Sequence, residues 1–322
     1  MKTRFAAGLS ALLLVPLLSF GQGAESYPAK PIRIVVNFPP GGSVDMMGRS
    51  IAQKLSDAFG QAVVVENRAG ASGNIGAESV AKSAADGYTL LMTNGATVTT
   101  NPHLYRMAFD TMTELTPVTQ VARISSMLAV HPSLPVRSAT EFLAYARANP
   151  GKLTYGSAGN GSGPHITAES MNRMARISTV HIPYKGIGPA QSDLLAGQLN
   201  FMFVDGSAYA QIRAGKLRML AVATGNRLSL LPDTPTMIEA GVPGFNYDSA
   251  HLLAAPGGTP REIIARLNAE VVKLLRSPEV NERIRATVAE VIANSPDEAS
   301  ASLRADFQRI GKLIQEMSIR AD

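Results

Sequence analysis

The sequence predicts an α/β protein with two lobes. Apolar, β-rich runs alternate with helical stretches along most of the chain, an alternation typical of sheets with helices on both faces. Two strand-to-helix turns, one near residue 40 and one near residue 160, are rich in glycine. A chain of 322 residues, 45% hydrophobic and 17% charged, is long enough to bury two cores of ordinary domain size.

Each predicted strand is a short apolar or β-branched run bounded by turn residues. The runs lie at 32–36, 62–65, 88–92, 126–131, 153–156, 179–183, 199–204, 218–223 and 252–255. Helical spacing follows several of them, as with Met47, Ile51 and Leu55, which recur four residues apart. The pattern predicts parallel sheets covered on both faces.

The first 24 residues have the order of a secretory signal peptide. Lys2 and Arg4 precede an uncharged run over 5–20, and small residues follow it. We expect cleavage after Gly23 or Ala24; an uncleaved membrane anchor is the alternative, although the run is short for a spanning helix. The mature protein is therefore expected to be exported.

Charge and cysteine content narrow the function classes. The formal net charge is +5, or +3 without the two cations of the first segment, and Lys and Arg are interspersed with acids rather than gathered in a stripe. This distribution argues against a nucleic-acid partner. The absence of cysteine excludes disulfides, a lipid anchor on an N-terminal cysteine and any thiolate metal site.

The first glycine turn follows the strand at 32–36 and precedes a helix. Its residues are Phe38, Pro39, Pro40, Gly41, Gly42, Ser43, Val44 and Asp45. Glycines let the backbone approach a ligand, and the free N–H groups and positive dipole at a helix start favour an anion such as a carboxylate. A nucleotide loop is disfavoured because the Lys-Ser/Thr pair is absent. The alternative is a tight turn in which Asp45 caps its helix.

The second glycine turn, 156–165, also lies between a strand and a helix. It contains Ser157, Asn160, Gly161, Ser162 and His165. Ligands of α/β folds lie beyond the carboxyl ends of parallel strands, so the two turns can face one another across a cleft. One ligand would then contact both turns.

A hydrolase is the competing hypothesis for these residues. Ser157, Ser162 and His165, with Asp45 or Asp205, contain the residue types of a triad, but neither serine has the flanking glycines of a Gly-x-Ser-x-Gly elbow. The five histidines show no chelating spacing, so no metal is expected. We interpret His131 and His251 as hydrogen-bonded structural residues.

Ordered motifs along the mature chain resemble the substrate-binding proteins of tripartite tricarboxylate transporters, the Bug family. They are Tyr27-Pro28, the Pro-Pro-Gly-Gly turn with Asp45, the stretches 64–68, 73–76, 86–90 and 149–153, the turn ending at His165, and the stretches 183–186, 214–218, 231–233, 257–260 and 267–270.

The resemblance implies a type II periplasmic binding protein fold, with two α/β lobes, two crossovers and a ligand cleft between the lobes. Crossovers near Ser125 and Ser249 would give residues 1–24 as signal peptide, 25–124 with 250–322 as lobe 1, and 125–249 as lobe 2. Hinge closure would enclose the ligand.

The resemblance also implies the site residues. In the family the two turns hold a carboxylate, largely through backbone N–H groups and bridging waters. Carried over by position are Gly41, Gly42, Asp45, Ser157, Asn160, Gly161, Ser162 and His165, and Thr93 and Asn94 occupy a third contact loop. Where the family often reads Met-Phe-Asp, this chain has Met-Phe-Val-Asp, which leaves the role of Asp205 open. Lys185 is either a partner for a second carboxylate or a surface cation.

We therefore expect a periplasmic, monomeric solute-binding protein without enzymatic activity, cofactor or metal. Its ligand would be a small organic carboxylate: a di- or tricarboxylate, an amino acid or an aromatic acid. Its partners would be the membrane subunits of a tripartite tricarboxylate-type transporter. A ligand-sensing module for a signalling partner is an alternative function, as is a secreted hydrolase.

Overall fold

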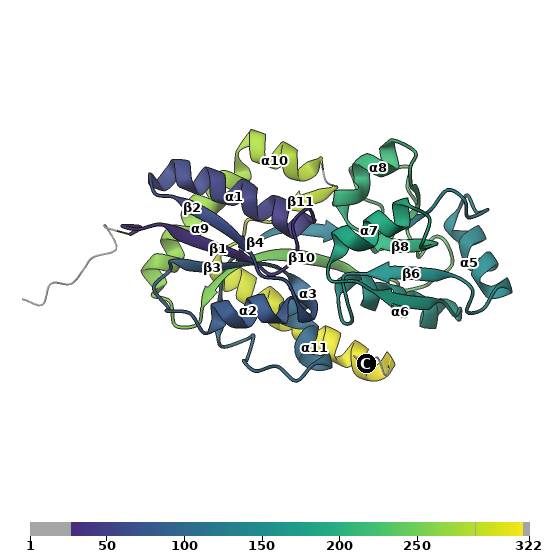
Figure 1. Ribbon diagram of the computed structural model, residues 1–322, viewed down its shortest axis with the longest axis horizontal. Helices are drawn as coiled ribbons and strands as arrows, with labels where there is room; N and C mark the ends of the chain where they lie inside the picture. Colours follow the sequence, from purple (N-terminus) through teal and green to yellow (C-terminus); the bar gives the residue numbers. More distant parts are fainter. Residues whose placement is uncertain (1–26, 287, 318–322) are drawn as a thin grey trace, which may run out of the picture.

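The computed structural model describes residues 27–286 and 288–317. The predicted signal peptide lies outside these residues. Two lobes, each built on one β-sheet, lie side by side along the longest axis of the molecule (Figure 1). The two-lobed α/β prediction is thereby confirmed.

Lobe 1 contains a six-stranded sheet in the order β11-β4-β10-β3-β1-β2. The strands are β1 (Ile32–Val36), β2 (Val63–Asn67), β3 (Thr89–Asn94), β4 (Leu115–Ser125), β10 (Asp248–Pro256) and β11 (Ala289–Val291). Strands β2 and β3 both pair parallel to β1, as the alternating pattern predicted.

Helices cover both faces of this sheet (Figure 1). One face carries α1 (Ser43–Phe59), α9 (Arg261–Arg276) and α10 (Pro278–Arg285). The other carries α2 (Asn74–Ala81), α3 (Gly95–Thr99) and α11 (Pro296–Met317), and the short α4 (Asn101–Leu104) packs against α3. Two apolar clusters fill the layers, and neighbouring strand residues alternate between them: Ile34 and Val36 belong to the first, Val35 to the second.

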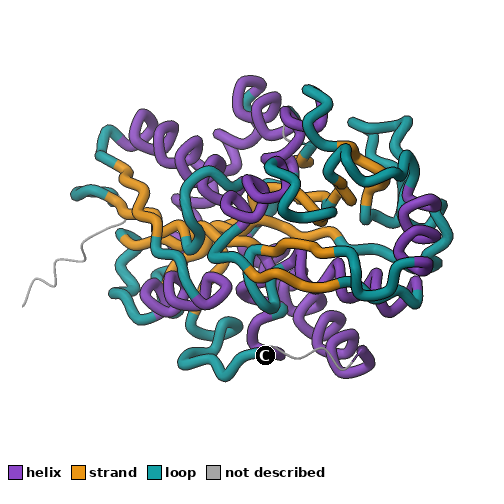
Figure 2. Tube along the Cα trace, turned by 45° about the vertical axis from the view of Figure 1, so that its right-hand side comes forward, coloured by secondary structure: helices purple, strands orange, loops and turns teal. Residues whose placement is uncertain are grey.

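Lobe 2 contains a five-stranded sheet in the order β7-β6-β8-β5-β9. The strands are β5 (Met127–Val130), β6 (Thr154–Ser157), β7 (Val180–Pro183), β8 (Phe201–Val204) and β9 (Arg218–Val222). Its helices are α5 (Ala139–Ala148), α6 (Gly163–Ala175), α7 (Ile187–Leu195) and α8 (Tyr209–Arg213). Figure 2 shows the strands running through the middle of the molecule, with the helices outside.

The chain passes between the sheets twice. β4 ends at Ser125 and β5 begins at Met127 in the other sheet, and the chain returns between β9 and β10. The long C-terminal α11 packs against β4 and α3 beside these passages.

Both sheets are mixed, so the prediction of parallel sheets is wrong in part. β10 runs antiparallel to β3 and β4, and β5 runs antiparallel to β8 and β9. A parallel neighbour within one sheet requires a long crossover, usually a helix. Strands β5 and β10 instead enter their sheets from a strand of the other lobe, β4 and β9 respectively, so no crossover within the sheet sets their direction. Strand β4 was not predicted because Pro117 and several polar residues interrupt its apolar pattern.

In the part of the chain that the structure describes, no helix combines the length and apolar character needed to cross a bilayer.

Candidate functional site

The two glycine turns follow β1 and β6, one in each lobe, and the lobes meet beside them. A Cβ placed on Gly42 would lie 2.8 Å from Ile187 Cγ2 of the other lobe. A Cβ on Gly186 would lie 2.6 Å from Pro39 Cδ. Glycine at these positions therefore allows the lobes to approach more closely than any side chain would permit.

A cavity of about 50 Å³ lies between the lobes at this contact. A single water needs about 10–15 Å³, so several waters or a small polar group fit. Its lining is Phe38, Pro39, Gly42, Ser43, Val44, Asn94, Ala158, Pro164, Ile187, Asp205 and His251. Asp205 is the one acidic group in this lining, which includes no Lys or Arg.

Helix α1 directs its N-terminus at the cavity. Gly42 is the N-cap residue, and no side-chain hydrogen bond caps the helix. The first-turn N–H groups of Ser43, Val44 and Asp45 have no partner within the helix, since the first intrahelical donor is Met46 N–H, which donates to Gly42 O over 3.0 Å. These donors and the helix dipole favour an anion.

Asp45 holds the first turn in shape and does not line the cavity. Its carboxylate accepts hydrogen bonds from Gly41 N–H (3.1 Å), from Asn67 Nδ2 (2.8 Å) and from Arg49 Nε (3.1 Å). Burial alone would raise the pKa of Asp45, but these hydrogen bonds and the Arg49 charge lower it below its ordinary value. Asp45 therefore fixes Gly41 and Gly42 for the contact that they make.

Ser43 connects the two lobes through its hydroxyl group. Ser43 Oγ donates to Asp205 Oδ2 of lobe 2 over 2.5 Å, and it lies 2.7 Å from His251 Nε2 of β10. The other oxygen of Asp205 accepts from the backbone N–H of Ser207 (2.9 Å) and from its hydroxyl group (2.5 Å). Both oxygens of Asp205 thus accept hydrogen bonds.

The polar side chains of the second turn hold the turn itself. Ser157 Oγ lies 2.7 Å from His181 Nε2, and Gly161 N–H donates to His165 Nδ1 over 3.0 Å. The rings of His165 and His181 stack at 4.2 Å. Burial, with a smaller contribution from His165, lowers the pKa of His181 to about 3. Ser162 Oγ is buried without a hydrogen-bond partner among the described residues.

Asn160 lies in a second interlobe compartment of about 220 Å³, which shares Phe38 and Ala158 with the cavity. Its carbonyl oxygen accepts from the hydroxyl groups of Ser72 and Tyr105 in lobe 1. Lys185 also lines this compartment. The lobes are therefore joined by hydrogen bonds here as well as at Ser43.

Comparison with known proteins identifies the family. The family model described as "Tripartite tricarboxylate transporter family receptor" matches residues 47–319. The chain belongs to this receptor family. BugT of Bordetella pertussis is 35% identical over 98% of this chain and 97% of BugT. A protein from the tcbD-tcbE intergenic region of Pseudomonas sp. strain P51 is 36% identical over 100% of this chain and 96% of its own.

Solved structures agree with this assignment. Rpa4515 of Rhodopseudomonas palustris, solved with adipate, superposes with a TM-score of 0.88 at 36% identity, covering 91% of this chain and 99% of that one. MatC from the same organism, solved with malate, gives 0.85 at 29% identity over 89% and 100%. The periplasmic binding protein BugD gives 0.87 at 31% identity over 91% and 99%. The receptor therefore has the type II periplasmic binding protein fold.

The structure brings together some of the receptor's predicted site residues and separates others. Those that line the cavity are Phe38, Gly42, Ser43, Val44, Asn94 and Asp205. Those outside its lining are Gly41, Asp45, Thr93, Ser157, Asn160, Gly161, Ser162 and His165. Thr93 is fully buried, while Asn94 Oδ1 accepts from Thr97 N–H over 3.1 Å and so caps α3.

Five lining residues of the receptor lie outside the set of individually predicted site residues: Pro39, Ala158, Pro164, Ile187 and His251. Pro39, Ala158 and Pro164 lie within the two turns that were predicted to close on the ligand. Ile187 and His251 reach the cavity only through the packing of the lobes. His251 was interpreted as structural; it does form a hydrogen bond, but to a residue of the cavity.

The hydrogen-bond order of Asp205, Ser43 and His251 differs from that of a hydrolytic triad. In a triad the histidine lies between the acid and the serine. Here the serine lies between the other two, and Asp205 does not bond to His251 Nδ1. No group of three or more His, Asp or Glu suited to hold a metal ion occurs among the described residues.

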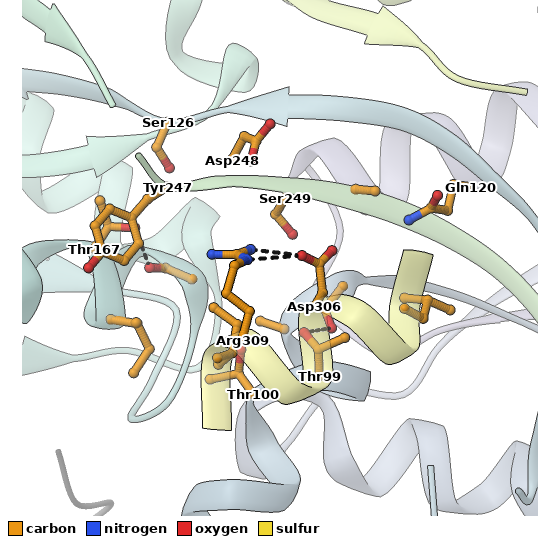
Figure 3. A pocket seen from close by; sticks show the side chains of 17 residues that line it. Thr99, Thr100, Gln120, Ser126, Thr167, Tyr247, Asp248, Ser249, Asp306 and Arg309 are labelled. Atoms are coloured by element: carbon orange, nitrogen blue, oxygen red, sulfur yellow. Dashed lines mark hydrogen bonds and ion pairs between the residues drawn. The ribbon is translucent and has the colours of Figure 1, made fainter. Parts of the chain in front are cut away.

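Another cavity, of about 60 Å³, lies under α11 where the chain passes between the lobes (Figure 3). The side chains of Tyr247 and Ser249 point into it, and Arg309 pairs with Asp306 at 2.8 Å. Its other charged lining residue, Asp248, pairs with Arg123 at 3.3 Å. Because its charges are already paired, this cavity is a poorer anion site than the one between the turns.

We expect Gly42→Ala to weaken ligand binding by about tenfold or more, because an overpacked contact costs about 1–3 kcal/mol. The clash with Ile187 exists only where the lobes meet, so the melting temperature should be nearly unchanged. Calorimetric titration measures the effect. Gly163→Ala in the opposite turn is the matched control, since its Cβ would meet no atom within 4 Å.

The partner substitution makes this prediction specific. In an Ile187→Ala background the added methyl group has room, so Gly42→Ala should then change affinity by only about twofold or less. An undiminished loss in the double variant would show that the clash is not the cause.

Asp45→Asn should lower the free energy of unfolding by about 1–2 kcal/mol at pH 7, because it weakens the hydrogen bonds to Gly41, Asn67 and Arg49. A lowered pKa stabilises the fold above the unfolded value of about 3.9, and that contribution disappears as pH falls through the folded pKa. Urea unfolding at pH 7 and pH 3 should show a larger difference at pH 7 than at pH 3. Asp57→Asn, at an exposed position of α1, is the control; an equal loss there would contradict the assignment.

Arg309→Ala should leave affinity within about twofold of the unmodified receptor, because an exposed ion pair contributes little and we expect the ligand between the glycine turns rather than in the cavity under α11. The same titration measures it. A tenfold loss would instead place the ligand under α11.

Proposed function

We propose that the receptor is a periplasmic solute-binding protein that captures a small organic carboxylate between its lobes and delivers it to the membrane subunits of a tripartite tricarboxylate-type transporter. One observation carries the proposal. An uncapped helix N-terminus from lobe 1 and the second glycine turn from lobe 2 border one cavity. Such a site can hold an anion through backbone N–H groups without a cationic side chain.

The ligands of two similar proteins support a dicarboxylate as the ligand of this receptor. Rpa4515 and MatC, whose structures contain adipate and malate, share the fold of this chain over most of its length. The compartment lined by Lys185 adjoins the cavity through Phe38 and Ala158. A dicarboxylate would place one end at the start of α1 and the other near Lys185.

The remaining parts of the proposal concern location and lobe movement. Residues 1–24 would direct export and be removed, after which a monomer would close its lobes, 25–124 with 250–322 and 125–249, on the ligand. The ligand would be released unchanged, because binding alone is the receptor's task. The site would comprise both glycine turns, the loop at Thr93 and Asn94, and Asp205.

Calorimetric titration with a panel containing adipate, malate, succinate, citrate, glutamate and benzoate tests this proposal. We expect saturation at one ligand per chain for at least one acid, and recovery of that acid intact by mass spectrometry. Chemical conversion of the acid would contradict the proposal. The proposal would also be contradicted if none of the panel acids saturated the protein.

A further inference from the structure

His251 lies in the cavity with one ring nitrogen bonded and the other free. The Ser43 hydroxyl has one proton, which it donates to Asp205 Oδ2, so the contact at 2.7 Å requires His251 Nε2 to be the donor. The neutral ring therefore carries its proton on Nε2 and a lone pair on Nδ1. Nδ1 is buried and has no hydrogen-bond partner among the described residues.

Burial keeps the ring of His251 neutral at neutral pH. His251 is 4% exposed, and burial lowers its pKa to about 4, although the Asp205 carboxylate acts in the opposite direction. No described residue forms a hydrogen bond with Nδ1 that could stabilise a proton there. An anion placed in the cavity would change this balance, because an opposite charge within about 4–6 Å raises a pKa by about 1–3 units.

Among the charged and titratable groups around the cavity, His251 is the one that can balance the charge of a bound anion. Asp205 is the charged group that acts on the ring, and it is negative, so a bound carboxylate would be a second anion in the same enclosure. Charged groups on the elements around β10 form ion pairs of their own: Glu78 with Lys82 on α2, Arg123 of β4 with Asp248, and Asp306 with Arg309 on α11. The lining itself contains no Lys or Arg.

We propose that His251 compensates the charge of the bound ligand: when a carboxylate enters the cavity, the ring takes up one proton on Nδ1, and the anion and the proton are bound together. The proton comes from the solvent and returns to it when the ligand leaves. This inference rests on the proposed capture of a carboxylate at this site.

The coupling between ligand binding and proton uptake by His251 makes the affinity higher at low pH. A pKa that is higher in the complex favours binding below that pKa, and the gain is lost as pH rises through it. With a shift of about two units, affinity at pH 5 should be about tenfold tighter than at pH 7.5. The acid's own protonation is common to all variants, so it cancels when variants are compared.

The test is titration with the panel acid that binds best, in buffers of different ionisation enthalpy, between pH 5 and pH 7.5. The apparent binding enthalpy of the unmodified protein should vary with the buffer enthalpy, with a slope that reports proton uptake. His251→Gln should lose the proton uptake that the His251 ring contributes on binding, and it should lose the higher affinity at low pH. His131→Gln, at a histidine of lobe 2 that bonds to Ser133 and lies outside the cavity lining, should retain both.

The outcomes separate this inference from the proposed function. If no panel acid saturates the protein, both are overturned. If an acid binds but His251→Gln takes up as many protons as the unmodified protein, the role of His251 alone is overturned, and Asp205 or the ligand carries the proton.

Nitrogen-15 NMR of the histidine rings in the unmodified protein covers the case in which His251→Gln does not fold. At pH 5 the His251 ring should change largely from the neutral Nε2–H form to the imidazolium form when adipate, or whichever panel acid binds, is added. A ring that stays neutral in the saturated complex would overturn the inference.

Discussion

Close contact between the two lobes at glycine is the constraint on which the rest of the site depends. Gly42 lies against Ile187, and Gly186 lies against Pro39, at distances that leave no room for a Cβ. These contacts bring the start of α1 and the second turn to one cavity. Asp45 holds the first turn in the required shape through Gly41 and Asn67. The glycines thus serve lobe contact as much as backbone access to the ligand.

The site is suited to an anion although its lining contains no Lys or Arg side chain. Backbone N–H groups at the start of α1 carry partial positive charge, and they are fixed in place by the helix, so they need no reorganisation on binding. Asp205 connects the lobes through Ser43 but adds negative charge. A neutral imidazole with a free nitrogen reconciles these features, because it can supply a positive charge only when the ligand is present.

The parts of the fold and site that the sequence predicted are local ones. The alternating strands and helices and both glycine turns, with Phe38, Gly42, Ser43 and Val44 of the lining, depend on patterns within a few positions. Asn94 and Asp205 of the lining were predicted from the resemblance to the family. The antiparallel direction of β10 and the cavity position of His251 depend on contacts between distant segments; Ser43 and His251 are 208 residues apart in the chain. Likewise, Ser157 and His165 have residue types suited to a ligand, but Ser157 contacts His181 and His165 accepts from Gly161, both within lobe 2.

The central claim is that the ligand carboxylate lies at the N-terminus of α1, between the lobes. A crystal structure of the complex with the tightest-binding panel acid tests it most directly. The account predicts carboxylate oxygens within hydrogen-bonding distance, about 2.7–3.2 Å, of the backbone nitrogens of Ser43 or Val44, directly or through one water. A ligand bound in the hinge cavity under α11, with the cavity between the turns filled only by water, would contradict it.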